Sequence, residues 1–208
     1  MTESQQRDYS TLRDRWCLPY NEELLNYSDI FSNTNDVFAE IGFGMGHAIS
    51  ELAQTNPDKN YLGIEVHKPG VGRLLSDIKH YALTNIFVIE HDAVEVLESM
   101  IGDNSIRGFH VFFPDPWPKK KHHKRRLLQE YFLELLAKKL CNDGYIYIVT
   151  DWQEYADFVL EEAKNISLLR NKYKDFAPAQ AWRPQTNFEK KGKKAGRNIC
   201  ELLFEKHV

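Results

Sequence analysis

Cysteine and long apolar segments are both scarce in this chain of 208 residues. Its three cysteines, Cys17, Cys141 and Cys200, are too few and too scattered for a disulfide framework or a paired-thiol zinc site, so we expect reduced thiols. The first 15 residues are polar and lack the apolar core of a signal peptide. No apolar segment approaches the roughly 20 residues that span a bilayer. We therefore expect a cytoplasmic protein with no membrane partner.

Basic residues are concentrated in two short windows, although the net charge is only −3. Residues Lys119–Arg126 and Arg183–Arg197 together hold 12 of the 27 Lys and Arg residues and a single acid, Glu189. A basic run is often no more than a solvated face, but two such runs on an acidic chain favour a polyanionic partner. His122 and His123 have no third ligand nearby in the sequence, so we expect no metal site.

The 42% of hydrophobic residues suffices for a sizeable core, and the chain from residue 36 onward alternates between strand and helix patterns. This alternation predicts an α/β protein with a doubly wound, mainly parallel sheet over residues 36–208, preceded by an N-terminal extension of residues 1–35. Strands are predicted at Val37–Ile41, Tyr61–Val66, Ile86–Ile89, Phe109–Phe113, Tyr145–Val149, Ile166–Leu169 and Ile199–Phe204. Helices are predicted at His47–Gln54, Gly70–Ala82, Val94–Met100, Leu127–Leu140 and Trp152–Lys164, with Asn142-Asp143-Gly144 ending the fourth. Ligands of such sheets bind outside the carboxyl ends of the strands.

The first strand ends in a glycine-rich turn, Glu40-Ile41-Gly42-Phe43-Gly44-Met45-Gly46. A dinucleotide-binding turn would place its third glycine at His47, and Glu40 would repel a diphosphate. A carboxylate there favours S-adenosylmethionine, which carries an ammonium and a sulfonium group. A tight turn with no ligand is the remaining alternative.

Acidic residues also end the next two strands. Glu65 could accept hydrogen bonds from both ribose hydroxyls of either cofactor class, or could be a solvated charge. Asp92 could accept from an adenine amino group, or could cap the following helix. Three acids at successive strand ends after a glycine turn form a stronger signal than any one of them.

The fourth strand ends in Pro114-Asp115-Pro116-Trp117-Pro118, where prolines stiffen a loop that holds a carboxylate beside an aromatic ring. Such a loop could stack a base and read its edge, or could be a structural turn. Amino-group methyltransferases use a related loop with two consecutive prolines, from which this one departs. Asp151 and Trp152 follow the fifth strand, where Asp151 could instead cap a helix, and Thr186-Asn187-Phe188-Glu189 interrupts the second basic window.

These motifs, EIGFGMG, HDA at Asp92, FPDPWPK at Phe113–Lys119, KRR at Lys124–Arg126, TDW and TNFE, resemble those of the bacterial tRNA (guanine-N7-)-methyltransferases of the TrmB type. The resemblance runs in order from about Asp36 to the C-terminus. It implies a Rossmann-like, class I methyltransferase fold with an antiparallel C-terminal strand. It further implies that the protein uses S-adenosylmethionine to methylate guanine 46 in the variable loop of tRNA.

The resemblance also implies roles for individual residues. Asp115 would be catalytic. Cofactor-binding residues would be Glu40, Gly42, Gly44, Gly46, Glu65, Asp92 and Asp115. Substrate-binding residues would be Lys119, Asp151, Thr186, Asn187, Phe188 and Glu189. RNA-binding residues would be Lys121, Lys124, Arg125 and Arg126.

Three other functions stay open at this point. The first is methylation of an exocyclic amine of RNA or DNA, which the single-proline loop disfavours. The second is RNA binding without catalysis on a methyltransferase fold, which the intact acids and glycines disfavour. A nicotinamide oxidoreductase is a more distant third. Whether the protein is a monomer or a homodimer does not follow from the sequence.

Overall fold

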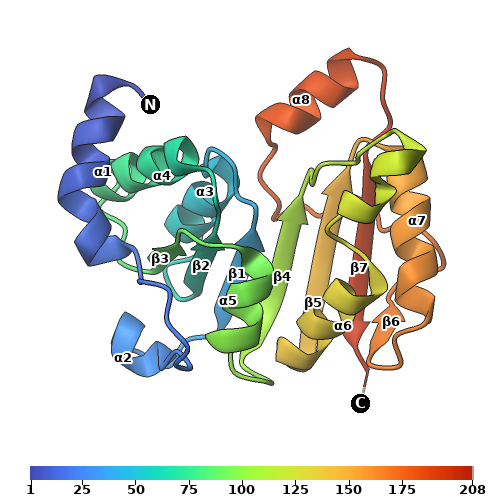
Figure 1. Cartoon of the computed structure of the whole chain (residues 1–208), viewed down its shortest axis with the longest axis horizontal. Helices are drawn as coiled ribbons and strands as arrows, with labels where there is room; N and C mark the ends of the chain where they lie inside the picture. Colours follow the sequence, from blue (N-terminus) through green and yellow to red (C-terminus); the bar gives the residue numbers. More distant parts are fainter. Residues whose placement is uncertain (208) are drawn as a thin grey trace.

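A computed structural model describes residues 1–207 of the chain. Its centre is a seven-stranded sheet in the order β3-β2-β1-β4-β5-β7-β6 (Figure 1). Neighbouring strands from β3 to β5 run parallel, and β7 runs antiparallel to both β5 and β6. The predicted fold class, including the antiparallel C-terminal strand, is therefore confirmed. The strands are β1 (Val37–Ile41), β2 (Asn60–Ile64), β3 (Ile86–Ile89), β4 (Ile106–Phe112), β5 (Leu140–Thr150), β6 (Leu169–Asn171) and β7 (Cys200–Lys206).

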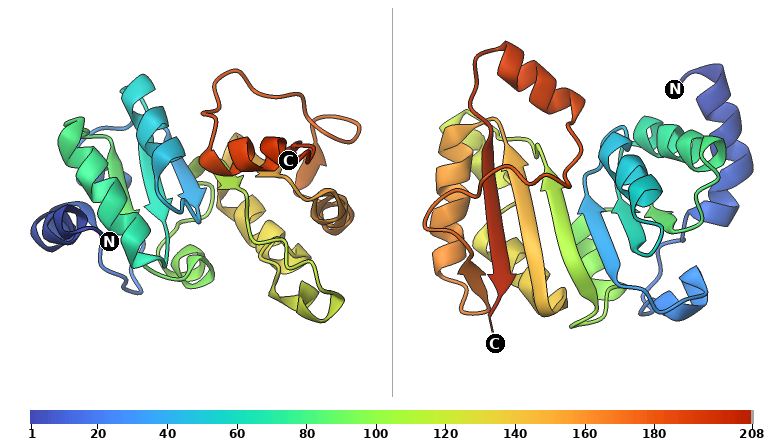
Figure 2. Two further views of the ribbon diagram at one scale, coloured as in Figure 1. Left: turned by 90° about the horizontal axis from the view of Figure 1, so that it is seen from above. Right: turned by 180° about the vertical axis from the view of Figure 1, so that it is seen from behind.

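Helices cover both faces of this sheet. Helices α3 and α4 lie on one face with α1 packed outside α4, and α5, α6 and α7 lie on the other (Figures 1 and 2). The helices are α1 (Glu3–Trp16), α2 (Tyr27–Phe31), α3 (His47–Thr55), α4 (Lys68–His80), α5 (Ala93–Ser99), α6 (Glu130–Lys139), α7 (Gln153–Lys164) and α8 (Asn187–Lys194), with a 3₁₀ segment η1 at Lys120–Arg125. Within residues 1–207, no helix combines the length and the apolar character that crossing a membrane requires.

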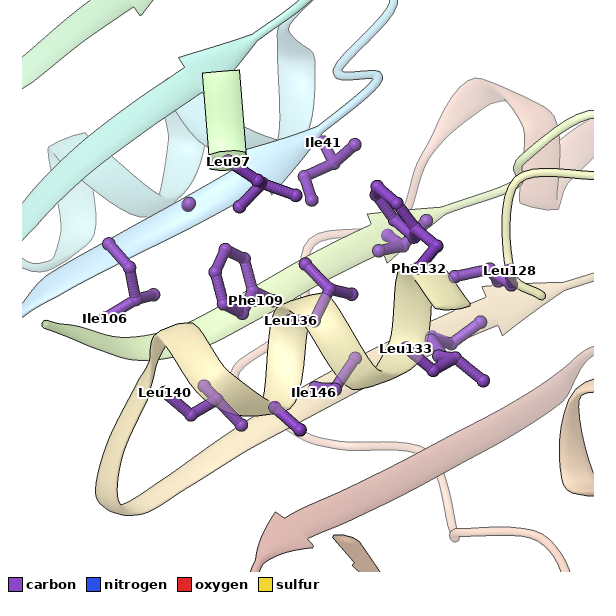
Figure 3. Close-up of a cluster of buried hydrophobic side chains, with 14 of the residues drawn as sticks. Ile41, Leu97, Ile106, Phe109, Leu128, Phe132, Leu133, Leu136, Leu140 and Ile146 are labelled. Carbon is purple, nitrogen blue, oxygen red and sulfur yellow. The ribbon is translucent and has the colours of Figure 1, made fainter. Parts of the chain in front are cut away.

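The strands are continuous apolar runs because both faces of the sheet are buried. All five residues of β1 and all five of β2 are buried. Figure 3 shows how α6 fills one face, with Phe132 and Leu136 directed toward Phe109 of β4 and Ile41 of β1. This packing fixes the carboxyl ends of β1, β2 and β4 side by side.

The first 35 residues contain two helices that the sequence analysis did not predict. Asp8 of α1 is buried and accepts hydrogen bonds from Ser76 Oγ at 2.9 Å and Lys79 Nζ at 2.9 Å, both on α4. Trp16 is buried in the core between α1, α4 and the sheet. Periodicity did not reveal α1, because nearly all of its residues are polar and few are buried. The division at residue 36 stays a prediction, but α1 packs on the sheet domain.

The stop signal predicted for the fourth helix and the predicted start of the sixth strand both differ from the structure for local reasons. Asn142-Asp143-Gly144 does not end α6; it is a bulge within β5, because Ile106 pairs with Leu140 and Gly108 with Tyr145. Asp143 takes a φ of 59°, which Asp tolerates better than most residues. The sixth strand begins at Leu169 rather than Ile166, because a turn in which the Leu169 amide donates to the Ile166 carbonyl precedes it.

The segment predicted as a basic loop between the last two strands contains α8. In Figure 2 the chain after β6 crosses the face of the sheet that α3 and α4 leave uncovered, then rises to α8 beyond the carboxyl ends of β4 and β5. Trp182 in this crossing segment packs on the Tyr147 ring, with 5.2 Å between centroids. The helix therefore lies where the strand ends carry their polar residues.

Candidate active site

A cavity of about 660 Å³ opens at the carboxyl ends of β1, β2 and β4, and α8 closes one side of it. This volume suits a small-molecule ligand. The lining brings together residues from four of the predicted motifs. It comprises Glu40–Met45, His47, Ala48, Glu65–His67, Phe112–Asp115, Trp117, Arg125, Leu127, Thr186–Phe188 and Lys191.

The glycine turn forms the cavity wall after β1. Gly42, Gly44 and Gly46 have φ values of 68°, 56° and 74°, in the left-handed region that favours glycine. Gly46 lies behind this wall, where a Cβ atom would come within 2.9 Å of Leu74. The glycine turn also requires a glycine at position 70 of α4, which the sequence analysis did not identify. A Cβ atom at Gly70 would lie 1.8 Å from the Gly44 carbonyl oxygen.

Glu65 holds this turn through its carboxylate. Oε2 accepts a hydrogen bond from the Gly44 amide at 2.7 Å, and Oε1 accepts from the Val66 and His67 amides at 2.8 Å each. The side chain is fixed at the end of β2 and lines the cavity. Since Oε2 uses one lone pair on Gly44, it can accept a further hydrogen bond from a ligand hydroxyl.

Glu40 is a buried carboxyl group with an unsatisfied oxygen. Its side chain is 3% exposed, and among the described residues Oε2 has no hydrogen-bond partner. Burial, with a smaller contribution from the nearby Glu65, raises the pKa of Glu40 to about 8. A buried acceptor of this kind fits a cationic ligand, which would supply both the missing partner and the missing positive charge. The residues present therefore fit the ammonium end of S-adenosylmethionine.

The proline-rich loop brings Asp115 to the same cavity. Phe113 and Trp117, which flank the Asp115 segment, have positive φ values of 53° and 45°, an uncommon conformation for aromatic residues. The guanidinium of Arg125 lies over the Trp117 ring, 5.1 Å from its centroid. Asp115 itself is exposed and lines the cavity.

Arg126 is a correction to the predicted RNA-binding set. Its side chain is buried, with Nη2 2.8 Å from Glu154 Oε2 and Nε donating to the Pro116 carbonyl at 3.0 Å. The guanidinium packs over the rings of Tyr155 and Phe158. It therefore cannot reach a phosphate, and instead it fixes the proline-rich loop to α7. Lys121, Lys124 and Arg125, by contrast, are exposed.

The TNFE motif caps and begins α8. Thr186 Oγ1 accepts from the Glu189 amide at 3.1 Å, and the exposed Phe188 ring stacks with Phe113 at 6.1 Å between centroids. Thr186, Asn187 and Phe188 line the cavity, whereas Glu189 is buried beneath the helix. Sequence reasoning grouped all four as substrate contacts because it did not predict the helix that separates them.

Besides Gly46 and Glu189, three predicted cofactor- or substrate-binding residues lie outside the cavity lining. Asp92 caps α5, accepting from the Val94 amide at 2.8 Å and the Glu95 amide at 3.4 Å. Lys119 is exposed at the start of η1. Asp151 pairs with Arg197, with 2.6 Å between Oδ2 and Nη1.

Several lining residues were not predicted. Phe43, His47, His67, Leu127 and Lys191 all face the cavity. His47 and His67 directly follow the glycine turn and the second strand, so their place at strand ends was a usable signal. The described residues contain no cluster of three or more His, Cys, Asp or Glu side chains suited to a metal ion.

Comparisons with known proteins identify the family of this chain. A family model described as a putative methyltransferase matches residues 34–202. The tRNA (guanine-N(7)-)-methyltransferase of Francisella philomiragia is 47% identical over 207 residues, covering 99% of this chain and 90% of that protein. Those of Neisseria meningitidis and Nitrosospira multiformis are 45% and 43% identical, each over 99% of this chain and 87% and 90% of their own lengths.

Solved methyltransferase structures share the fold at low sequence identity. The 16S rRNA methyltransferase KamB superposes with a TM-score of 0.65 at 12% identity, covering 89% of this chain and 95% of that one. An S-adenosylmethionine-dependent O-methyltransferase from Thermotoga maritima gives 0.56 at 11% identity, with 90% and 68% coverage. Identities of 43–47% over nearly the whole chain show more than a shared fold, and on that basis the chain belongs to the tRNA (guanine-N(7)-)-methyltransferase family.

Proposed function

We propose that this protein transfers the methyl group of S-adenosylmethionine to N7 of guanine 46 in the variable loop of tRNA, in the cytoplasm. The observation that carries the proposal is the shared cavity, which Glu40, Glu65, Asp115 and Phe188 all line. Glu40 and Glu65 are called the cofactor wall below, and Asp115 with Phe188 the base wall. The first wall fits a cationic cofactor with a ribose. The second offers a carboxylate and an aromatic ring to a base.

Each acidic residue near the cofactor would bind a different group of it. The buried Glu40 would accept the amino-acid ammonium, and the partly satisfied Glu65 would accept a ribose hydroxyl. Asp92 would accept from the adenine amino group with a lone pair that its capping bonds leave available. When bound, S-adenosylmethionine supplies a methyl group on a sulfonium, which a nitrogen lone pair can attack directly.

The base wall needs no general base. Guanine N7 carries no proton and has a lone pair in the ring plane, so Asp115 would not have to abstract a proton to create the nucleophile. Its carboxylate would accept from the guanine N1 and N2 hydrogens, orient N7 and offset the positive charge that develops on the purine. The Phe188 ring, 57% exposed and held by Phe113, offers a surface for base stacking.

Exposed basic side chains accompany the two segments that bring Arg125 and Lys191 into the cavity lining. Lys119, Lys121, Lys124 and Arg125 project from the proline-rich loop and η1, and further lysines lie on α8. These groups would contact tRNA phosphates. The affinity for tRNA should then fall steeply with salt, because each neutralised phosphate releases condensed counterions.

The test is to incubate the protein with labelled S-adenosylmethionine and unmodified tRNA and to map the modified nucleotide. We expect label in 7-methylguanosine at position 46. A matched tRNA with adenine at position 46 should remain unlabelled. Label on an exocyclic amine would reassign the reaction, and cofactor binding without any transfer would leave an RNA-binding protein.

A further inference from the structure

Arg183 lies between two buried carboxylates that belong to different elements. Its Nη1 is 2.7 Å from Oε2 of Glu189 in the first turn of α8, and its Nη2 is 2.9 Å from Oε1 of Glu201 on β7. All three side chains are 5% exposed. A single guanidinium thus joins α8 to the sheet.

The connection continues into the centre of the sheet. The Tyr147 hydroxyl on β5 donates to Oε2 of Glu201, the oxygen that Arg183 does not use. Burial, together with this bond to Glu201, raises the pKa of Tyr147, so the hydroxyl remains a donor. Tyr147, Glu201, Arg183 and Glu189 therefore form one continuous hydrogen-bonded chain from β5 to α8.

Helix α8 has almost no apolar anchor of its own. Burial within it is confined to Glu189 and Gly192. Gly192 rests on Asp151, whose Oδ2 would lie 2.9 Å from a Cβ atom at that position. Asp151 is in turn paired with Arg197. Charged groups contribute more to holding this helix than hydrophobic packing does, since its buried residues are Glu189 and Gly192 and Glu189 pairs with both Arg183 and Lys193.

The part of α8 that Arg183 holds is the part that enters the cavity. Thr186, Asn187 and Phe188 line the cavity directly before Glu189. Burial opposes ionisation of Glu189, but hydrogen bonds and charge from Arg183 and Lys193 outweigh it and lower its pKa. Glu189 and Glu201 share the Arg183 guanidinium. Removing it would leave buried negative charge with less compensation and would destabilise this part of the fold.

We propose that Arg183 is a positioning residue that, through Glu189 and Glu201, sets the Thr186–Phe188 wall against the base-binding side of the cavity. The assignment rests on the proposed function for its effect on tRNA methylation, but the placement of α8 can be tested without it. Lysine keeps the charge at position 183 but cannot bridge two carboxylates in fixed geometry. Arg183→Lys is therefore the informative change.

The experiment compares Arg183→Lys with Lys172→Met, which removes a cation paired with Glu205 on β7 away from the cavity. Amide hydrogen exchange of α8, melting temperature, cofactor affinity and the kcat and KM of tRNA methylation are measured for each. For Arg183→Lys we expect α8 amides to exchange about 10-fold faster while β5 and β7 amides keep their protection. Methylation should fall at least about 10-fold in kcat/KM, with cofactor affinity changed no more than about 3-fold. Lys172→Met should change none of these.

A double variant tests whether Glu201 and Arg183 act together. Because Glu201 acts through Arg183, Glu201→Gln combined with Arg183→Lys should cost little more methylation than Arg183→Lys alone. Additive losses would overturn the shared role. Lost methylation with unchanged α8 exchange would make Arg183 a direct substrate contact, and faster exchange throughout the sheet would make it a general structural residue. Unchanged exchange and activity would remove it altogether. If the wild-type protein methylates another atom, the proposed function is wrong. The hydrogen-exchange measurement would still show whether Arg183 holds α8 in place.

Discussion

The carboxylate of Glu65 accepts a hydrogen bond from the Gly44 amide across the cofactor wall, with 2.7 Å between Oε2 and N. This bond ties the end of β2 to the glycine turn after β1. A residue that sequence reasoning assigned to ribose binding therefore also shapes the turn on which the cofactor would lie. Loss of its carboxylate removes both contributions at once.

Glu65→Ala should weaken S-adenosylmethionine binding by about 1.5–3 kcal/mol, because it deletes a charge-assisted hydrogen bond and releases the Gly44, Val66 and His67 amides. Isothermal titration calorimetry measures the change. Glu65→Gln, which still accepts hydrogen bonds, should lose less. Equal affinity of wild type and Glu65→Ala would take Glu65 out of the cofactor site.

Glu40 makes cofactor affinity depend on pH. With its pKa raised to about 8 by burial, Glu40 is mostly protonated at pH 7 and must lose its proton to hold an ammonium. Affinity for S-adenosylmethionine should therefore rise from pH 6 toward pH 8 and fall again at higher pH, where the α-amino group of the ligand loses its own proton. Calorimetry in buffers of different ionisation enthalpy would detect the released proton. A flat profile would contradict this coupling.

The raised pKa of Glu40 also makes the stability of the folded protein depend on pH. The folded protein retains a proton on Glu40 that the unfolded chain loses near the ordinary value of 4.5, so stability should fall as pH rises from about 4.5 to 8. Glu40→Gln removes this term and should melt higher than wild type above pH 8. A melting temperature of Glu40→Gln below that of wild type at pH 9 would refute the argument.

The sequence predicted the sheet well because both of its faces are buried, which leaves apolar runs at β1 to β5 that turn residues separate. It did not predict α1 or α8, since these helices use buried charges, such as Asp8 and Glu189, in place of an apolar stripe. Glu40, Glu65 and Asp115, which the sequence analysis singled out by their position at strand ends, line one cavity. Neighbouring residues of a basic run look alike in sequence, so the burial of Arg126 beside the exposed Arg125 depended on tertiary contacts with α7.

The two kinds of basic residue in this run should behave differently. Replacing the exposed Lys121, Lys124 and Arg125 with alanine should weaken tRNA binding and flatten its salt dependence by up to about 3 units if each neutralises one phosphate. Binding titrations at several salt concentrations give the slope, and cofactor affinity should hardly change. An unaltered slope would make the run a solvated face.

Arg126→Met is the matched comparison. It should leave the salt slope unchanged and lower the free energy of unfolding by about 1.5–3 kcal/mol, because the Pro116 carbonyl and Glu154 lose a charged partner. Denaturant titration measures this loss. A flattened salt slope in Arg126→Met with full stability would restore Arg126 to the RNA-binding surface.

Asp115 provides the sharpest test of the chemistry. It lies between Phe113 and Trp117 in a loop that the hydrogen bond from Arg126 to the Pro116 carbonyl ties to the rest of the fold. If its negative charge offsets the charge that develops on guanine, Asp115→Asn should lower the methylation rate by about 10²–10³. Single-turnover measurements at saturating tRNA isolate that step. A loss in tRNA affinity alone, with the rate intact, would reduce Asp115 to a binding contact.

The substrate atom can be tested from the other side of the same reaction. A tRNA with 7-deazaguanine at position 46 keeps the N1 and N2 hydrogens that Asp115 would accept from, but a carbon replaces the nucleophilic N7. It should bind with nearly the affinity of normal tRNA and accept no methyl group. Methylation of the deaza substrate would move the reaction to an exocyclic amine and give Asp115 the role of a proton acceptor.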